Sequence, residues 1–122
     1  MYEALTDYLP KIQDSDSWVR DTSCYIDYTP TVNEFRKEIF TFMDNHPEYE
    51  LNRYIDTLRT IGTEWGTRGL QRVDVSDLDG KVIMALLMAA ERGEYNSQGV
   101  ILDLLESGTI QKWLLRLKEL GN

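Results

Sequence analysis

The sequence is poor in the residues that build disulfides and metal sites: it has one cysteine and one histidine among 122 residues. A lone Cys24 cannot form an internal disulfide, which is typical of proteins kept in a reducing compartment. Structural zinc requires several cysteine or histidine ligands, so Cys24 and His46 together exclude such a site. We therefore expect a cytoplasmic protein with no metal and no cofactor.

Long hydrophobic segments are also missing. The apolar run from Val82 to Ala90 spans nine residues, whereas a helix needs about 20 to cross a bilayer. The first residues lack the basic and apolar regions of a secretion signal. We expect no membrane association.

Positive charge is scarce. The chain has 13 basic and 21 acidic residues and a formal net charge of −8, with the excess concentrated in residues 1–60. Non-specific binding to nucleic acid requires a basic surface. Direct nucleic-acid binding is therefore not expected, and the ordinary interpretation of the acidic excess is a solubilising surface.

The residues that are abundant predict helices. The run from Val82 to Ala90 is apolar on every side, so this helix must be covered all round and should lie at the centre of the domain. We expect it to open after Ser76 and to end at Gly93. Further helices are expected over residues 4–12, 31 to about 45, 49–61, 97–107 and 109–120, from apolar positions three and four apart. Their expected caps are Thr31 with Glu34, Ser97 and Thr109.

Between these helices lie irregular segments. Residues 13–23 are polar and acidic, residues 24–28 alternate as in an extended strand, and residues 63–75 show no sustained period. The prediction is an all-α fold: one compact domain of five or six helices around a central apolar helix. It comprises a short helix with an irregular, aromatic-rich arm in residues 1–30 and a helical core in residues 31–122. The short connections favour antiparallel neighbours.

Motifs for catalysis or ligand binding are absent. Aligning the acids before Gly80 with a calcium loop places Val75 and Leu86 where ligands are required. The glycines at 62, 66 and 69 lack the lysine or the preceding strand of a phosphate-binding loop. No motif supports a pairing of Cys24 with His46. We lean against an enzyme and assign no catalytic residue.

The aromatic side chains are the stronger lead. Tyrosine and tryptophan are enriched at binding hot spots, and several lie in the N-terminal arm and in the loop after residue 62. The candidate interface residues are Trp18, Tyr25, Tyr28 and Trp65. The alternative is that the arm wraps the helical core and these rings seal it.

The second half of the chain shows a pattern running from Tyr95 to Leu120. It comprises Tyr95-Asn-Ser-Gln-Gly99, the leucine-rich stretch from Leu102 to Leu105, Gly108-Thr-Ile110 and Trp113-Leu-Leu-Arg-Leu-Lys-Glu-Leu120. With the Pro30-Thr-Val-Asn-Glu-Phe35 segment, it resembles an uncharacterised bacterial and phage family of small helical proteins, a domain of unknown function. Gln98 stands where that family's pattern has an acid. The resemblance implies a helical fold and a bacterial or phage origin, and it implies no activity.

Three functions remain open. The first is a non-enzymatic, cytoplasmic protein-interaction module, favoured by the aromatic arm; its partner is another protein, and a homodimer is compatible with it. The second is an acidic phage-type inhibitor that mimics phosphates and binds a host nucleic-acid-processing protein. The third is a small ligand-binding or carboxylate-based enzyme domain with a pocket between helices.

Overall fold

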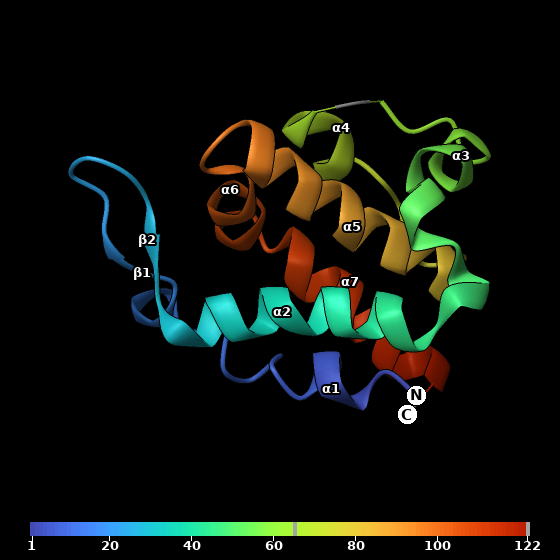
Figure 1. The fold of residues 1–122 in the computed structure, drawn as a ribbon, viewed down its shortest axis with the longest axis horizontal. Helices are drawn as coiled ribbons and strands as arrows, with labels where there is room; N and C mark the ends of the chain where they lie inside the picture. Colours follow the sequence, from blue (N-terminus) through green and yellow to red (C-terminus); the bar gives the residue numbers. More distant parts are fainter. Residues whose placement is uncertain (65, 122) are drawn as a thin grey trace.

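The computed structural model describes residues 1–64 and 66–121. Within them, seven α-helices surround a single core, together with three short 3-10 helices and one two-stranded ribbon (Figure 1). The α-helices are α1 (Glu3–Thr6), α2 (Pro30–Asn45), α3 (Tyr54–Arg59), α4 (Thr67–Gln71), α5 (Gly80–Asn96), α6 (Val100–Glu106) and α7 (Thr109–Gly121). The all-α prediction is confirmed. The additional helix is α4, which lies in a segment expected to be irregular and is too short to show an extended period. Helix α1 lies where a helix over residues 4–12 was expected, but it ends at Thr6.

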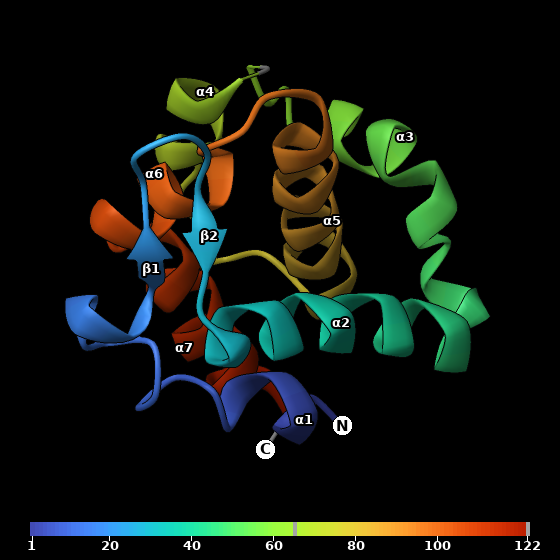
Figure 2. The ribbon, with the colours of Figure 1, turned by 60° about the vertical axis from the view of Figure 1, so that its left-hand side comes forward.

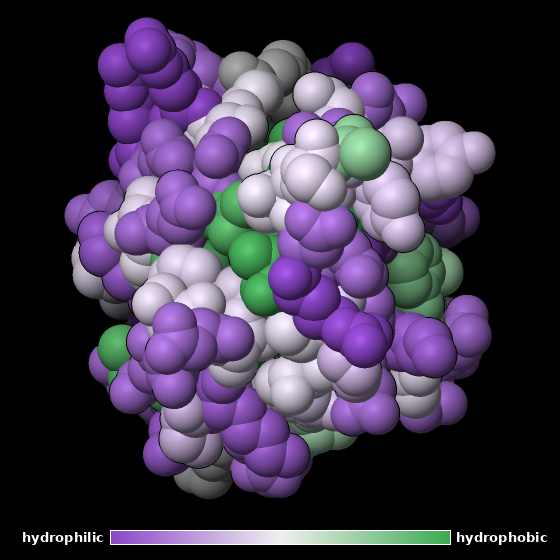
Figure 3. Space-filling model, turned by 90° about the vertical axis from the view of Figure 1, so that its left-hand side faces the viewer, coloured by the Kyte–Doolittle hydropathy of each residue, from purple (hydrophilic) through white to green (hydrophobic). Residues whose placement is uncertain are grey.

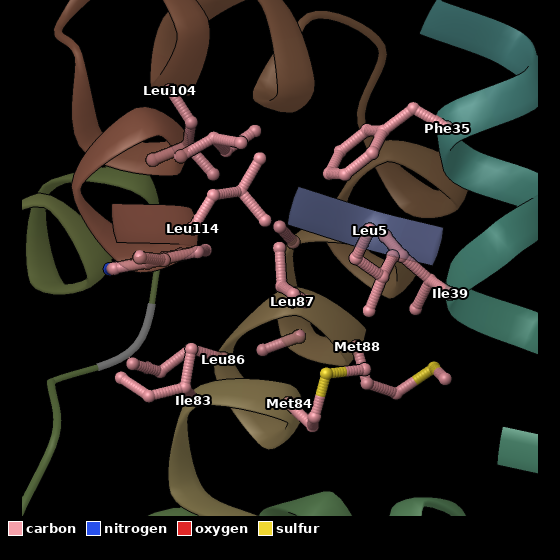
Figure 4. Close-up of a cluster of buried hydrophobic side chains, with 14 of the residues drawn as sticks. Leu5, Phe35, Ile39, Ile83, Met84, Leu86, Leu87, Met88, Leu104 and Leu114 are labelled. Atoms are coloured by element: carbon pink, nitrogen blue, oxygen red, sulfur yellow. The ribbon is translucent and has the colours of Figure 1, made fainter. Parts of the chain in front are cut away.

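Helix α5 is the central element, as its sequence predicts. Asp79 caps it by accepting a hydrogen bond from the Val82 N–H at 3.0 Å. Every residue from 83 to 90 is buried. Helices α2, α3, α4, α6 and α7 all contact α5, and Figure 4 shows Leu5, Phe35, Leu104 and Leu114 converging on its side chains from different elements. The cap lies three residues after the expected Ser76, because the aspartate side chain supplies the acceptor that an amide needs at that turn.

Helix α2 begins earlier than expected. Thr29 is its N-cap, and the Thr29 hydroxyl accepts from the Val32 N–H at 3.4 Å. Pro30 is the first helical residue, a position that suits its fixed φ and its missing N–H. The predicted capping box of Thr31 with Glu34 is therefore wrong. The apolar positions three and four apart that predict this helix are Val32, Phe35, Ile39, Phe42 and Met43. The first four are buried and Met43 is partly buried.

The N-terminal arm is mostly irregular and covers the core. Helix α1 ends at Thr6, and i-to-i+3 hydrogen bonds continue the chain toward Ile12, consistent with a proline at position 10. Leu5, Leu9 and Ile12 are all buried, and α1 contacts both α2 and α7. The Met1 ammonium donates to the Gly121 carbonyl at 3.3 Å. The two ends of the described chain therefore lie side by side (Figures 1 and 2).

Two other boundaries differ from expectation. The predicted helix over residues 49–61 is divided into the 3-10 helices Pro47–Tyr49 and Leu51–Arg53 and the α-helix α3, because Glu50 adopts left-handed backbone angles with φ 52°. Helix α5 continues past Gly93 to Asn96, and Ser97 is its C-cap rather than the cap of the next helix. Gly99, with φ 105°, precedes α6 instead.

Candidate functional site

A short β-ribbon stands at one end of the molecule. Strand β1 (Val19–Asp21) pairs antiparallel with β2 (Asp27–Tyr28), and Val19 lies opposite Tyr28. The segment that joins the strands reaches away from the helices at its turn (Figures 1 and 2). The pairing partner of the predicted extended segment is thus part of the stretch that the sequence indicated as a loop.

Tyr28 anchors this ribbon to the helical body. Its side chain is 5% exposed, and its hydroxyl donates to the Glu94 carboxylate at 2.7 Å. The same hydroxyl accepts from the Leu102 N–H at 3.0 Å. Burial raises the pKa of Tyr28, and the hydrogen bond to Glu94 raises it further.

Glu94 connects Tyr28 to the start of α6. Its carboxylate also accepts from the Gly99 N–H at 3.0 Å and the Ile101 N–H at 2.9 Å. These are amides at the start of α6 that have no partner within the helix. A glutamate near the end of α5 therefore supplies the cap that Gly99 lacks, and joins α5, α6 and the ribbon in one network.

An ion pair lies beside this network. The Arg36 guanidinium donates to both carboxylate oxygens of Glu91, with an Nη2–Oε1 distance of 2.8 Å. The Glu91 side chain is 8% exposed and that of Arg36 is 23% exposed. The guanidinium carbon also lies 5.4 Å from the centre of the Tyr28 ring, within cation–π range.

The chemistry of this cluster is structural. Glu91 and Glu94 each accept at least two hydrogen bonds, and the Tyr28 hydroxyl both donates and accepts. A general base needs a lone pair directed at a substrate, and here the lone pairs are directed at protein donors. The cluster links the base of the ribbon to α2, α5 and α6.

The four residues predicted to form an interface do not share one environment. Tyr25, between the strands, is 62% exposed. Trp18 is partly buried, and its indole N–H donates to the Ile12 carbonyl at 2.7 Å. Tyr28 is buried, which corrects the prediction that its ring is available to a partner. Trp65 lies outside the described residues. For Trp18 and Tyr28, the alternative that the rings seal the core describes the structure better.

The described segment that contains Tyr25 also carries aspartates without a cationic partner. Residues 13–29 contain four aspartates, at positions 14, 16, 21 and 27, against a single base, Arg20. In the part of the chain that the structure describes, none of these aspartates forms an ion pair. Hydrogen bonds from the Ser23 N–H and hydroxyl lower the pKa of Asp21. Figure 3 shows hydrophilic and intermediate residues over most of the end of the molecule that carries the ribbon, with a small hydrophobic group near the centre of the view.

A second feature is a groove that no sequence pattern indicated. It has a volume of about 360 Å³ and is lined by residues of α3, α4, α5 and α6, including Leu70, Arg92 and Val100. Its members come from segments too far apart in the chain to form a motif. The His46 ring stacks on Phe42, and its Nδ1 atom lies 2.9 Å from Glu48 Oε1. The side chain of Cys24 is exposed.

Comparisons with protein-family models, with curated proteins and with solved structures find no match to this chain. No helix among the described residues is long and apolar enough to cross a membrane. The described residues also contain no group of three or more histidine, cysteine, aspartate or glutamate side chains placed to hold a metal ion.

Proposed function

We propose that this chain is a non-enzymatic, cytoplasmic protein-interaction module that contacts a basic partner protein through the β-ribbon. The observation that carries the proposal is Tyr25. It is a large aromatic side chain, 62% exposed, on a ribbon whose base is anchored by the buried Tyr28.

The anchoring of the ribbon at its base favours binding. Aromatic side chains are enriched at hot spots because they bury a large area while few rotatable bonds are frozen. A binding surface that is already ordered loses less conformational entropy when a partner docks. The bonds from Tyr28 to Glu94 and Leu102 supply that order before binding.

The charge of the ribbon supports a basic partner. Asp14, Asp16 and Asp21 precede Tyr25 in the sequence, are exposed, and have no cationic partner among the described residues. Complementary charge accelerates association and selects the partner, and its effect decreases as salt screens the charges. A positively charged protein surface would be attracted to this end of the molecule.

The test is photo-crosslinking from defined positions. A photoreactive phenylalanine replaces Tyr25 in one variant and Tyr95 in another, a matched tyrosine that is 84% exposed on α5. In bacterial cells, position 25 should capture a specific basic protein and position 95 should not. Equal products from both positions, or none from position 25, would contradict the proposal.

The same unpaired aspartates favour a second candidate, the acidic inhibitor that occupies a nucleic-acid site. Competition separates the two. If the captured protein is released by a DNA or RNA oligonucleotide, the ribbon occupies a nucleic-acid site on its partner. If the complex persists with the oligonucleotide bound, the partner uses a different basic surface.

A further inference from the structure

We propose that the groove between α3, α4, α5 and α6 binds a small organic monoanion: an apolar body with one carboxylate. This site is separate from the ribbon and does not depend on the proposed interaction function. Its floor is apolar, with Leu70, Ala89 and Val100 among the lining residues. Polar groups of Thr67, Arg92 and Asn96 also line it.

The charge of the groove selects an anion. Among its described lining residues there is one arginine and no carboxylate, in a chain with 21 acidic residues. Three other grooves in the described structure each include at least one acid: Glu64 and Asp74, Asp74 and Glu119, or Glu38. The groove at Arg92 is therefore the one of these four where a bound carboxylate meets no like charge from the lining.

Arg92 is available for this role. The guanidinium groups of Arg36, Arg53, Arg59, Arg72 and Arg116 lie within ion-pair distance of carboxylates. In the described part of the chain, Arg20, Arg68 and Arg92 have no such partner, and of these three Arg92 is the one that lines any of these four grooves. A guanidinium presents two parallel N–H donors that match the geometry of a carboxylate.

The size and single charge narrow the ligand class. A volume of about 360 Å³ lies in the range of small-molecule sites, which are mostly apolar with a few placed polar groups. One cation compensates one negative charge, so a carboxylate suits the groove better than a polyphosphate. The Asn96 side-chain amide donates one of its two N–H groups to the Arg92 carbonyl at 3.1 Å, and its second N–H remains able to donate to a carboxylate.

The experiment uses octanoate as the probe and the neutral, isosteric octanamide as its comparison. Both are titrated into the ¹⁵N-labelled full chain while the amide resonances of Thr67, Ala89, Gly93 and Val100 are followed. We expect octanoate to shift these resonances and to bind at least tenfold more tightly than octanamide. A bidentate, charge-assisted contact accounts for a ratio of this size.

Variants identify the cation. Arg92→Gln should weaken octanoate binding about tenfold and remove the preference over octanamide. The control is Arg68→Gln, which removes an exposed, unpaired arginine that does not line the groove and should leave binding unchanged. Unchanged thermal melting in both variants shows that the fold is intact. Equal binding of the two probes, equal loss in both variants, or no shift up to 10 mM octanoate would overturn the proposal.

Discussion

The Tyr28 hydroxyl donates to the Glu94 carboxylate across 66 residues of sequence, at a distance of 2.7 Å. This bond joins the β-ribbon to the end of the central helix. Because Glu94 also accepts from the first amides of α6, one carboxylate sets the position of three elements. The exposed Tyr25 is presented on a structure that this network keeps in place.

Removing the Tyr28 hydroxyl should destabilise the fold. Tyr28→Phe keeps the ring but leaves the Leu102 N–H without its acceptor and Glu94 with one donor fewer. A buried polar group left unsatisfied costs about 1–3 kcal/mol. Urea unfolding should show this loss, whereas Tyr25→Phe on the exposed side of the ribbon should change stability by less than about 0.5 kcal/mol. Similar losses in both variants would contradict the anchoring role.

Removing one partner of the Arg36–Glu91 pair should lower the free energy of unfolding more than replacing both partners by apolar residues. Arg36→Met leaves the Glu91 carboxylate, only 8% exposed, without its cation. Uncompensated buried charges cost about 3–5 kcal/mol, and the partial exposure of Arg36 places the expected loss near 3 kcal/mol. The double variant Arg36→Met with Glu91→Leu should recover most of it. Denaturant unfolding of the three proteins tests this; a double variant no better than Arg36→Met would contradict it.

Alkaline pH should destabilise the protein. Burial raises the pKa of Tyr2 and of Tyr28. The hydrogen bond with Tyr49 raises the pKa of Tyr2 further, and the hydrogen bond to Glu94 raises that of Tyr28 further. In the unfolded chain both titrate near pH 10. The folded state thus keeps protons that the unfolded state releases, so stability is complete below about pH 10 and decreases above it. The free energy of unfolding should decrease by up to about 1.4 kcal/mol per pH unit for each tyrosine.

Urea midpoints measured between pH 8 and pH 11 test that sign and slope. Tyr28→Phe should make the alkaline decrease shallower, because one of the two raised tyrosines is gone. A decrease of unchanged steepness in this variant would show that other groups cause it. Absorbance of the tyrosinate ion near 295 nm reports directly whether ionisation accompanies unfolding.

Gly69 should not tolerate a side chain. A Cβ atom at this position of α4 would lie 1.9 Å from the Glu64 carbonyl oxygen. Because the obstructing atom belongs to the backbone, the loop before α4 must shift, and overpacking of this kind costs about 1–3 kcal/mol. Gly69→Ala should lower the thermal midpoint even though alanine favours helices by about 1 kcal/mol. A raised midpoint would show that the loop yields easily.

The sequence predicts helices correctly where the periodicity of apolar residues and their need for burial indicate the same element. The apolar run from Val82 to Ala90 can be solvated on no side, so its central position follows from the hydrophobic effect alone. The last helix begins at Thr109, in agreement with its expected range over residues 109–120, because a glycine precedes a regular apolar stripe. Thr109, its expected cap, is instead its first helical residue. The fold class required no more than these signals.

Helix starts were predicted less well, because several side chains in a row can serve as caps. Ser97 and Thr31 have the right chemistry, but Glu94 and Thr29 are the groups that reach the free amides. A glutamate that caps the following helix from the preceding one depends on the turn between them. No local rule selects it over the nearer serine.

The candidate interface shows the same limit. Tyr25 and Tyr28 are the same residue type three positions apart, and composition cannot distinguish them. The sequence by itself determined a helical domain with a buried central helix, since those properties depend on local periodicity and on the removal of apolar surface from water. Only the tertiary structure decided that Tyr28 is an anchor, that Tyr25 is exposed, and that Arg92 lines a groove without carboxylates. Each of these depends on contacts between segments that are distant in the chain, and such contacts are set by the packing of the whole domain.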